Sequence, residues 1–162
     1  MSRFSSRNYS VAVVPTGVDA LWAVLTDPSA LAELTPLVAR IEANGDQWSW
    51  TLVGVSALGV SAAPTFTERM TVEPRSRIVF AHDPKPGQRE RAGADGVYEL
   101  LEVDTSATRL SIDITAWVEL PLPSFARPAV ERVMATTMQR AGDRFARGLY
   151  TRLGLDPNGL QT

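Results

Sequence analysis

His82, the only histidine in the chain, is the first residue to consider for chemistry. Its imidazole is the only side chain here that ordinarily titrates near neutral pH, so it is the natural candidate for a general base. It follows Ile78 and Phe80 at the two-residue spacing of a strand, which predicts that it shares their face. One histidine without a fixed partner is weak evidence for catalysis, and we favour a structural role for it.

Glu68 is the second catalytic candidate, because it interrupts an otherwise apolar strand face between Phe66 and Met70. A buried acid at this place would have either a raised pKa or an arginine partner, and either can mark a functional site. The alternative, which we favour from the sequence, is a glutamate in water at a sheet edge or cavity mouth.

Large apolar side chains recur on the strands and along one arc of a C-terminal helix. They are candidates for the walls of a site for an apolar ligand, and packing in an ordinary core is the equal alternative. The strand residues are Trp48, Trp50, Phe66, Met70, Phe80 and Tyr98, and the helix residues are Met134, Thr137, Ala141 and Phe145. The small Ala141, next to Gly142, leaves room on this arc that a filled core would occupy.

Composition excludes several classes of protein. The chain has 162 residues, 44% hydrophobic and 21% charged, which suits one globular domain spanning residues 1–162. The absence of cysteine, together with the single histidine, argues against a metal centre, and we expect no cofactor. A net charge of −2 argues against nucleic-acid binding. No segment is apolar enough for a secretion signal or membrane insertion, so we expect a cytoplasmic protein.

The elements that must position these residues can be read from periodicity and breakers. A valine-rich strand over 9–14 is followed by two short helices, for which Thr16 and Ser29 are the expected N-caps. Alternation and turn signals predict further strands over 38–43, 47–55, 65–73, 77–83, 97–104 and 108–120. The polar segment from Pro84 to Gly93 reads as a mobile loop, and a long helix is expected from Ser124 to Leu153. This order predicts an α+β fold, with an antiparallel sheet of six to seven strands around the C-terminal helix.

Four segments carry a family resemblance: PTGVDALW at 15–22, VARIE at 38–42, EPRSRIVF at 73–80 and ELPLPSFARPAVERV at 119–133. With the order of elements, they resemble the helix-grip fold of the START-like (SRPBCC) superfamily, and most of all its polyketide cyclase/dehydrase-like branch. One departure is Leu34-Thr35-Pro36, where many relatives carry a tryptophan before the proline.

The resemblance implies a cavity between sheet and helix that takes lipids, polyketides, isoprenoids or other apolar molecules. Since such proteins range from carriers to enzymes, three functions stay open. The first is binding or carriage of a hydrophobic small molecule. The second is a cyclase or dehydratase in which His82, with Glu68 or Tyr98, moves protons. The third is a protein-interaction module with an exposed patch around Trp117 on the outer strand face.

Overall fold

The computed structural model of the chain describes residues 1–159, without the side chains of Val55 and Ala57. Seven strands form one antiparallel sheet in the order β1-β9-β8-β7-β6-β3-β2. Their bounds are β1 Ser2–Val14, β2 Val38–Asn44, β3 Gln47–Leu52, β6 Thr65–Glu73, β7 Arg77–His82, β8 Ala92–Asp104 and β9 Ala107–Leu120. A separate hairpin joins β4 Val55–Ala57 to β5 Val60–Ala62.

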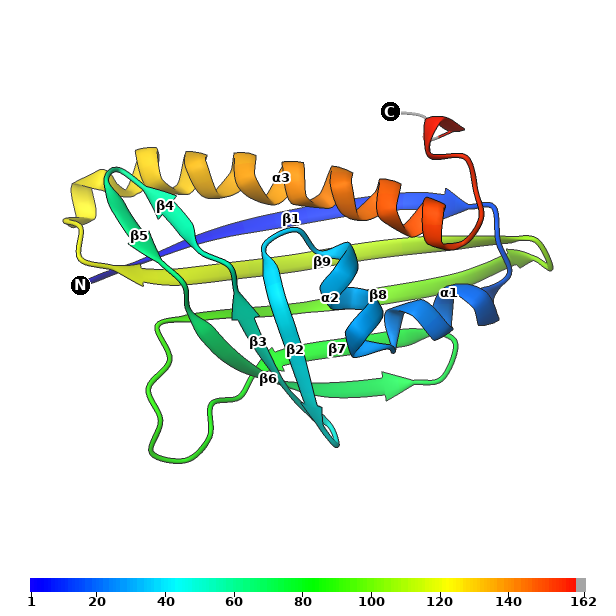
Figure 1. Cartoon of the computed structure of the whole chain (residues 1–162), viewed down its shortest axis with the longest axis horizontal. Helices are drawn as coiled ribbons and strands as arrows, with labels where there is room; N and C mark the ends of the chain where they lie inside the picture. Colours follow the sequence, from blue (N-terminus) through cyan, green and yellow to red (C-terminus); the bar gives the residue numbers. More distant parts are fainter. Residues whose placement is uncertain (160–162) are drawn as a thin grey trace.

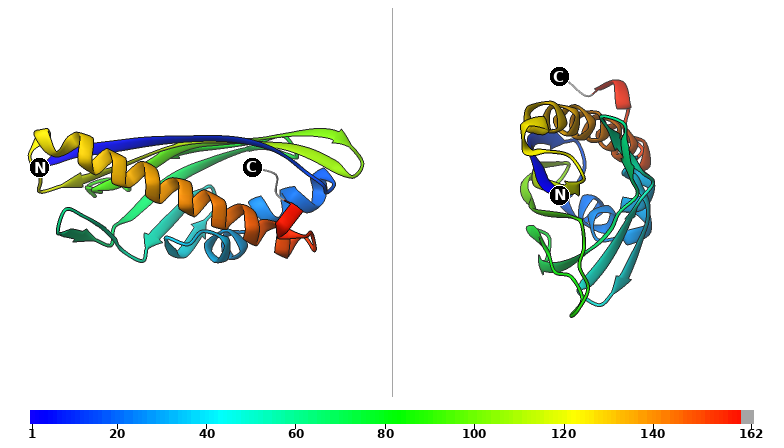
Figure 2. Two further views of the ribbon diagram at one scale, coloured as in Figure 1. Left: turned by 90° about the horizontal axis from the view of Figure 1, so that it is seen from above. Right: turned by 90° about the vertical axis from the view of Figure 1, so that its left-hand side faces the viewer.

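The helices lie on one side of this sheet. The long helix α3, Arg127–Arg152, runs along β1 (Figure 1) and follows a short 3-10 turn, η1 Ser124–Ala126. Seen end-on, the sheet curls below α3, with the short helices α1 Val18–Leu25 and α2 Pro28–Leu34 at the far end (Figure 2). A 3-10 turn η2, Pro157–Gly159, follows α3. The α+β helix-grip architecture expected from the sequence is confirmed.

The strands alternate as the sequence pattern requires, which defines two faces of the sheet. The inner face, toward α3, carries Phe4 on β1, Leu110 on β9 and Tyr98 on β8, and all three are buried. The outer face carries Arg7 and Asp113, which form a bidentate ion pair across the first two strands. We call the space between the inner face and α3 the interior.

Both expected helix caps are wrong. The N-cap of α1 is Gly17, whose backbone is extended and which offers no side-chain acceptor. The N-cap of α2 is Asp27, not Ser29, and its carboxylate accepts hydrogen bonds from the backbone N–H groups of Ser29 and Ala30 at 3.0 and 3.4 Å. Pro28 occupies the first helical position, where its missing N–H costs nothing, so the helix begins two residues earlier than a cap at Ser29 would place it.

Several strand bounds also differ from the expected ones. β1 starts at Ser2, well before the expected start at residue 9. The sequence pattern did not indicate this part of the strand, because arginines and serines alternate along its outer face and leave no apolar signal there. β8 starts at Ala92, so the connecting loop is 83–91 and excludes Gly93, which pairs with Trp117. The expected strand 47–55 ends at Leu52, and the residues after it, where no strand was expected, include the second strand of the β4–β5 hairpin.

Candidate ligand-binding site

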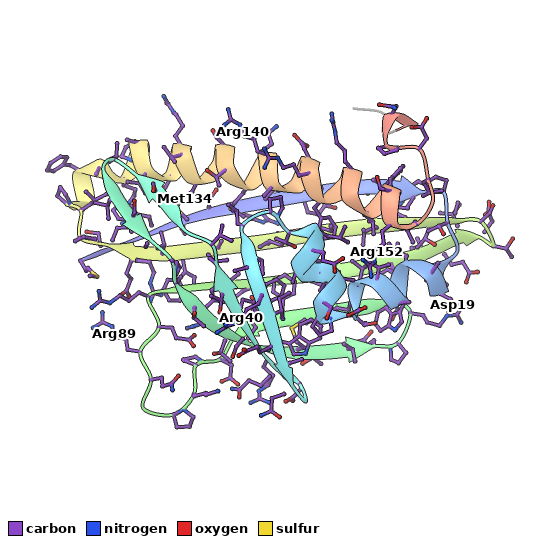
Figure 3. All side chains as sticks on the ribbon, in the orientation of Figure 1. Asp19, Arg40, Arg89, Met134, Arg140 and Arg152 are labelled. Atoms are coloured by element: carbon purple, nitrogen blue, oxygen red, sulfur yellow. The ribbon has the colours of Figure 1, made fainter. Side chains whose placement is uncertain are left out.

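The inward stripe of α3 is buried at its ends and half-exposed in its middle. Val130 is fully buried near the N-terminus of the helix, and Phe145 and Leu149 are buried near its C-terminus. The residues between them on the same stripe are only partly buried: Met134, Thr137 and Ala141. Figure 3 places Met134 on the side of α3 toward the sheet and Arg140 on the opposite side.

The inner face of β9 repeats this pattern. Leu110 and Val118 are 5% and 9% exposed, and the three inner-face residues between them are half-buried: Ile112, Ile114 and Ala116. A Cβ added to Gly142 on α3 would lie 3.5 Å from the side chain of Asn8 on β1, which pairs with Ile114, so the middle of α3 lies over β1 beside the half-buried stretch of β9. A filled core would bury apolar side chains here, so the middle of the interior is accessible.

Aromatic rings build the other wall of the interior, on β3, β6, β7 and β8. Trp50 stacks parallel to Phe66 with ring centroids 6.3 Å apart, and Phe80 meets Tyr98 edge-to-face at 5.2 Å. Trp48 and Met70 extend the same face, and both are buried. Of the ten side chains predicted to line a ligand site, these six therefore lie together on the inner face of the sheet, opposite the four on α3.

Phe80 can lie against the sheet only because β8 has a glycine beneath it. A Cβ added to Gly96, its cross-strand partner, would come within 2.5 Å of Phe80 Cζ. The absence of a side chain at Gly96 thus sets the position of the ring that packs against Tyr98.

Glu68 is buried among these rings, so the water-exposed glutamate that the sequence favoured is wrong. It is 2% exposed and lies in register between Trp48 on β3 and His82 on β7. Burial raises its pKa well above the usual 4.5, and the negative charge of Asp95 adds to this, while the Trp50 indole acts in the opposite direction. The surroundings of Glu68 therefore favour its neutral form over its ionised form more than water does.

Two buried polar atoms, Oε2 of Glu68 and Nε1 of Trp50, lack a partner in hydrogen-bonding geometry among the described residues. The indole nevertheless lies near enough to the carboxyl to lower its pKa as a donor. The phenol of Tyr98 belongs to the same group, because burial and then the charge of Glu68 raise its pKa. The interior thus holds an acid, an indole N–H and a phenol in otherwise apolar surroundings, and such groups are hydrogen-bonded in most folded proteins.

His82 is engaged in a different cluster, at the end of β7. Its Nε2 lies 2.8 Å from Glu90 Oε2, and its ring meets Trp117 edge-to-face at 5.0 Å. Glu90 in turn accepts hydrogen bonds from the backbone N–H and the hydroxyl of Thr67, at 2.8 and 2.7 Å. Because β7 ends at His82, the Glu90 carboxylate takes the place of a strand carbonyl beside β6. Sequence reasoning missed this partner, since Glu90 sits in a polar loop and nothing in its neighbours marks it.

The exposed patch suggested around Trp117 is absent from the structure. Trp117 is only 9% exposed, because the Arg3 guanidinium lies 3.9 Å above its ring and His82 covers its edge. Glu119 holds Arg3 and Arg89 on its two carboxylate oxygens, at 3.2 and 3.0 Å, which fixes the cover in place. Figure 3 shows Arg89 on the 83–91 loop beside this edge.

Two shallow hollows, of about 480 and 240 Å³, lie on the outer face of the sheet. Charged side chains surround them, including Arg77, Glu99 and Asp113, so they do not suit an apolar molecule. Among residues 1–159 no group of three potential metal ligands is found, and no described helix has the length and apolar character to cross a membrane.

Comparison with known proteins identifies the fold. No family model matches the chain, and no curated protein matches its sequence. Among solved structures, the Zhui aromatase/cyclase from Streptomyces sp. R1128 superposes with a TM-score of 0.67 at 15% identity, over 93% of this chain and 94% of that one. A START superfamily protein from Mycobacterium smegmatis gives 0.63 at 15%, over 91% and 97%. A conserved protein from Geobacillus kaustophilus gives 0.68 at 18%, over 91% and 95%. The chain therefore has the START-like, polyketide cyclase-like helix-grip fold.

Proposed function

We propose that this protein binds a hydrophobic small molecule, lipid-, polyketide- or isoprenoid-like, in the interior between the curved sheet and α3. One observation carries the proposal: on the facing surfaces of α3 and β9 the residues at both ends are buried, and those between them are only partly buried. The side chains of this stretch are mainly apolar, beside the polar Asn8 and Thr137. An apolar ligand there would gain about 25 cal/mol for each Å² of apolar surface removed from water.

Binding or carriage accounts for the polar groups better than catalysis does. A cyclase or dehydratase needs a group that takes up a proton near neutral pH. His82 Nε2 is engaged by Glu90 and its ring by Trp117, burial raises the pKa of Tyr98, and Glu68 Oε2 has no acid–base partner among the described residues. With Trp117 covered, the patch suggested for a protein-interaction module does not support that function. The cytoplasmic location and the absence of a cofactor remain predictions.

Native mass spectrometry of the freshly purified protein, followed by organic extraction, tests the proposal directly. We expect a bound species whose extracted mass corresponds to an apolar compound. Titration with the uncharged dye Nile red provides a second measurement that does not depend on what co-purifies, and we expect one molecule to bind per chain.

A matched pair of variants assigns the dye to the interior. Ile114→Trp places a large ring in the half-exposed middle of the inner face and should weaken Nile red binding at least about tenfold. Val11→Trp adds a similar bulk on the outer face, where Val11 is 48% exposed, and should leave binding unchanged. Loss of binding in both variants, or in neither, would refute an interior site, as would a protein that binds no dye.

A further inference from the structure

The unpartnered pair of Glu68 and Trp50 is the feature of the interior that packing leaves unexplained. Their free atoms, Oε2 and Nε1, are both fully buried. A buried polar group without a partner destabilises a protein, and two close together are unusual unless a third group completes them.

Both groups present hydrogen-bond donors. An indole N–H can only donate, and a carboxyl group held neutral offers one O–H. Glu68 is buried, and none of the ion pairs formed by the described residues includes it, so its surroundings favour the neutral carboxyl. The nearest complement to two adjacent donors is one oxygen with two lone pairs.

We infer, building on the proposed function, that the ligand is an apolar molecule with one carbonyl group. The oxygen of this carbonyl accepts hydrogen bonds from Trp50 Nε1 and from the Glu68 carboxyl. A carboxylate would bring a second negative charge toward Asp95 and Glu68. A hydroxyl oxygen could accept from both donors, but its own proton would then need an acceptor among largely apolar side chains. An ammonium group would attract an ionised Glu68 and the aromatic rings, but it would leave the Trp50 N–H unpaired.

Three probes with one skeleton separate these chemistries: 2-acetylnaphthalene, 2-isopropylnaphthalene and 1-(2-naphthyl)ethylamine. Each is titrated against bound Nile red in the full-length protein near pH 6. We expect the ketone to compete about tenfold better than the hydrocarbon, as two net hydrogen bonds would produce, and the protonated amine to compete least.

Variants then assign the preference to the two donors. Trp50→Phe keeps a ring but removes the N–H, and Glu68→Leu removes the carboxyl, so each should reduce the preference for the ketone to about threefold or less. Glu68→Gln retains an N–H donor and should preserve most of it. Trp22→Phe, on α1, removes an indole N–H outside the site and serves as the control.

The infrared stretching frequency of the bound ketone, labelled with carbon-13 at the carbonyl, reports hydrogen bonding to its oxygen directly. A purely structural role of Trp50 and Glu68 would not change this frequency. In wild type, the band should lie below its position in hexane, and it should move back toward that position in Trp50→Phe and Glu68→Leu.

Each other outcome overturns the inference. Equal binding of ketone and hydrocarbon, with an unshifted band, would mean that Trp50 and Glu68 pair with one another, and the proposed function would survive. Tightest binding of the amine, lost in Glu68→Gln, would make the site a cation site. If Nile red itself does not bind, the proposed function fails and the carbonyl site fails with it.

Discussion

Replacing Glu68 with glutamine should abolish a pH-dependent loss of stability that the buried acid causes. Glutamine keeps the shape and a polar head but cannot ionise. Glu68 is 2% exposed, and its pKa is raised by burial first and by Asp95 second. The native state therefore holds a proton that the unfolded chain releases.

The sign and slope follow from this difference in bound protons. Below about pH 4.5, the usual pKa of a glutamate, both states are protonated and Glu68 makes no pH-dependent contribution. Above it, the unfolded chain loses the proton while the native protein keeps it. The free energy of unfolding then falls by about 1.4 kcal/mol per pH unit until the pH reaches the native pKa of Glu68, where the loss levels off.

Urea unfolding followed by circular dichroism, at steps of half a pH unit from about pH 4 to pH 8, measures this loss. The informative quantity is the stability of wild type minus that of Glu68→Gln. The exposed acids with lowered pKa values, such as Asp113 and Glu119, raise stability with pH equally in both proteins and cancel. Glu102→Gln, an exposed acid on β8, is the control and should follow wild type. Parallel curves for wild type and Glu68→Gln would refute the buried neutral acid.

Three further substitutions test the packing around the site. Ala141→Phe should change the free energy of unfolding by less than about 1 kcal/mol while weakening Nile red binding, whereas a loss of about 1–3 kcal/mol with no dye bound in wild type would mean a filled core. His82→Ala should lower the free energy of unfolding by about 1.5–3 kcal/mol through the lost contact with Glu90, yet leave Nile red affinity within about tenfold. Urea unfolding and dye titration measure the two quantities, and unchanged stability with a large loss of dye affinity would contradict the prediction. Gly96→Ala should lower the urea midpoint, because the added Cβ would meet Phe80, and an unchanged midpoint would contradict that contact.

Most of the fold could be predicted because local signals agreed with the tertiary result. The hairpin over Asn44-Gly45-Asp46 and the strand 65–73 have the bounds that turn chemistry and alternation predict, to within a residue or so. The first half of β1 could not be predicted, since its outer residues Arg3, Ser5 and Arg7 show no apolar alternation and become a strand only through pairing with β9.

The site was predictable as a list of side chains but not as an arrangement. Alternation placed Trp50 and Glu68 on strand faces, yet only the pairing of β3 with β6 makes Phe66 the partner of Trp50 and brings Glu68 within reach of the indole. The burial of Glu68 was missed for the same reason, because a single acid between apolar residues is more often in water. The partner of His82 comes from a loop, where sequence spacing carries no information about contacts.

Glu68 is the residue of the interior that folding stability alone would not favour. Leucine at position 68 would pack against Trp48 and Phe66 without a proton to hold or an oxygen left unpaired, so above about pH 4.5 the acid only destabilises the empty protein. A buried position that carries an unpaired polar group in place of an apolar side chain is expected mainly at a functional site. If the carbonyl assignment is right, stability and selectivity must therefore move in opposite directions in one variant: Glu68→Leu gains stability as pH rises relative to wild type and loses the preference for the ketone over the hydrocarbon. A variant that gained stability with its ligand preference intact would separate the two effects and leave the acid without a role in binding.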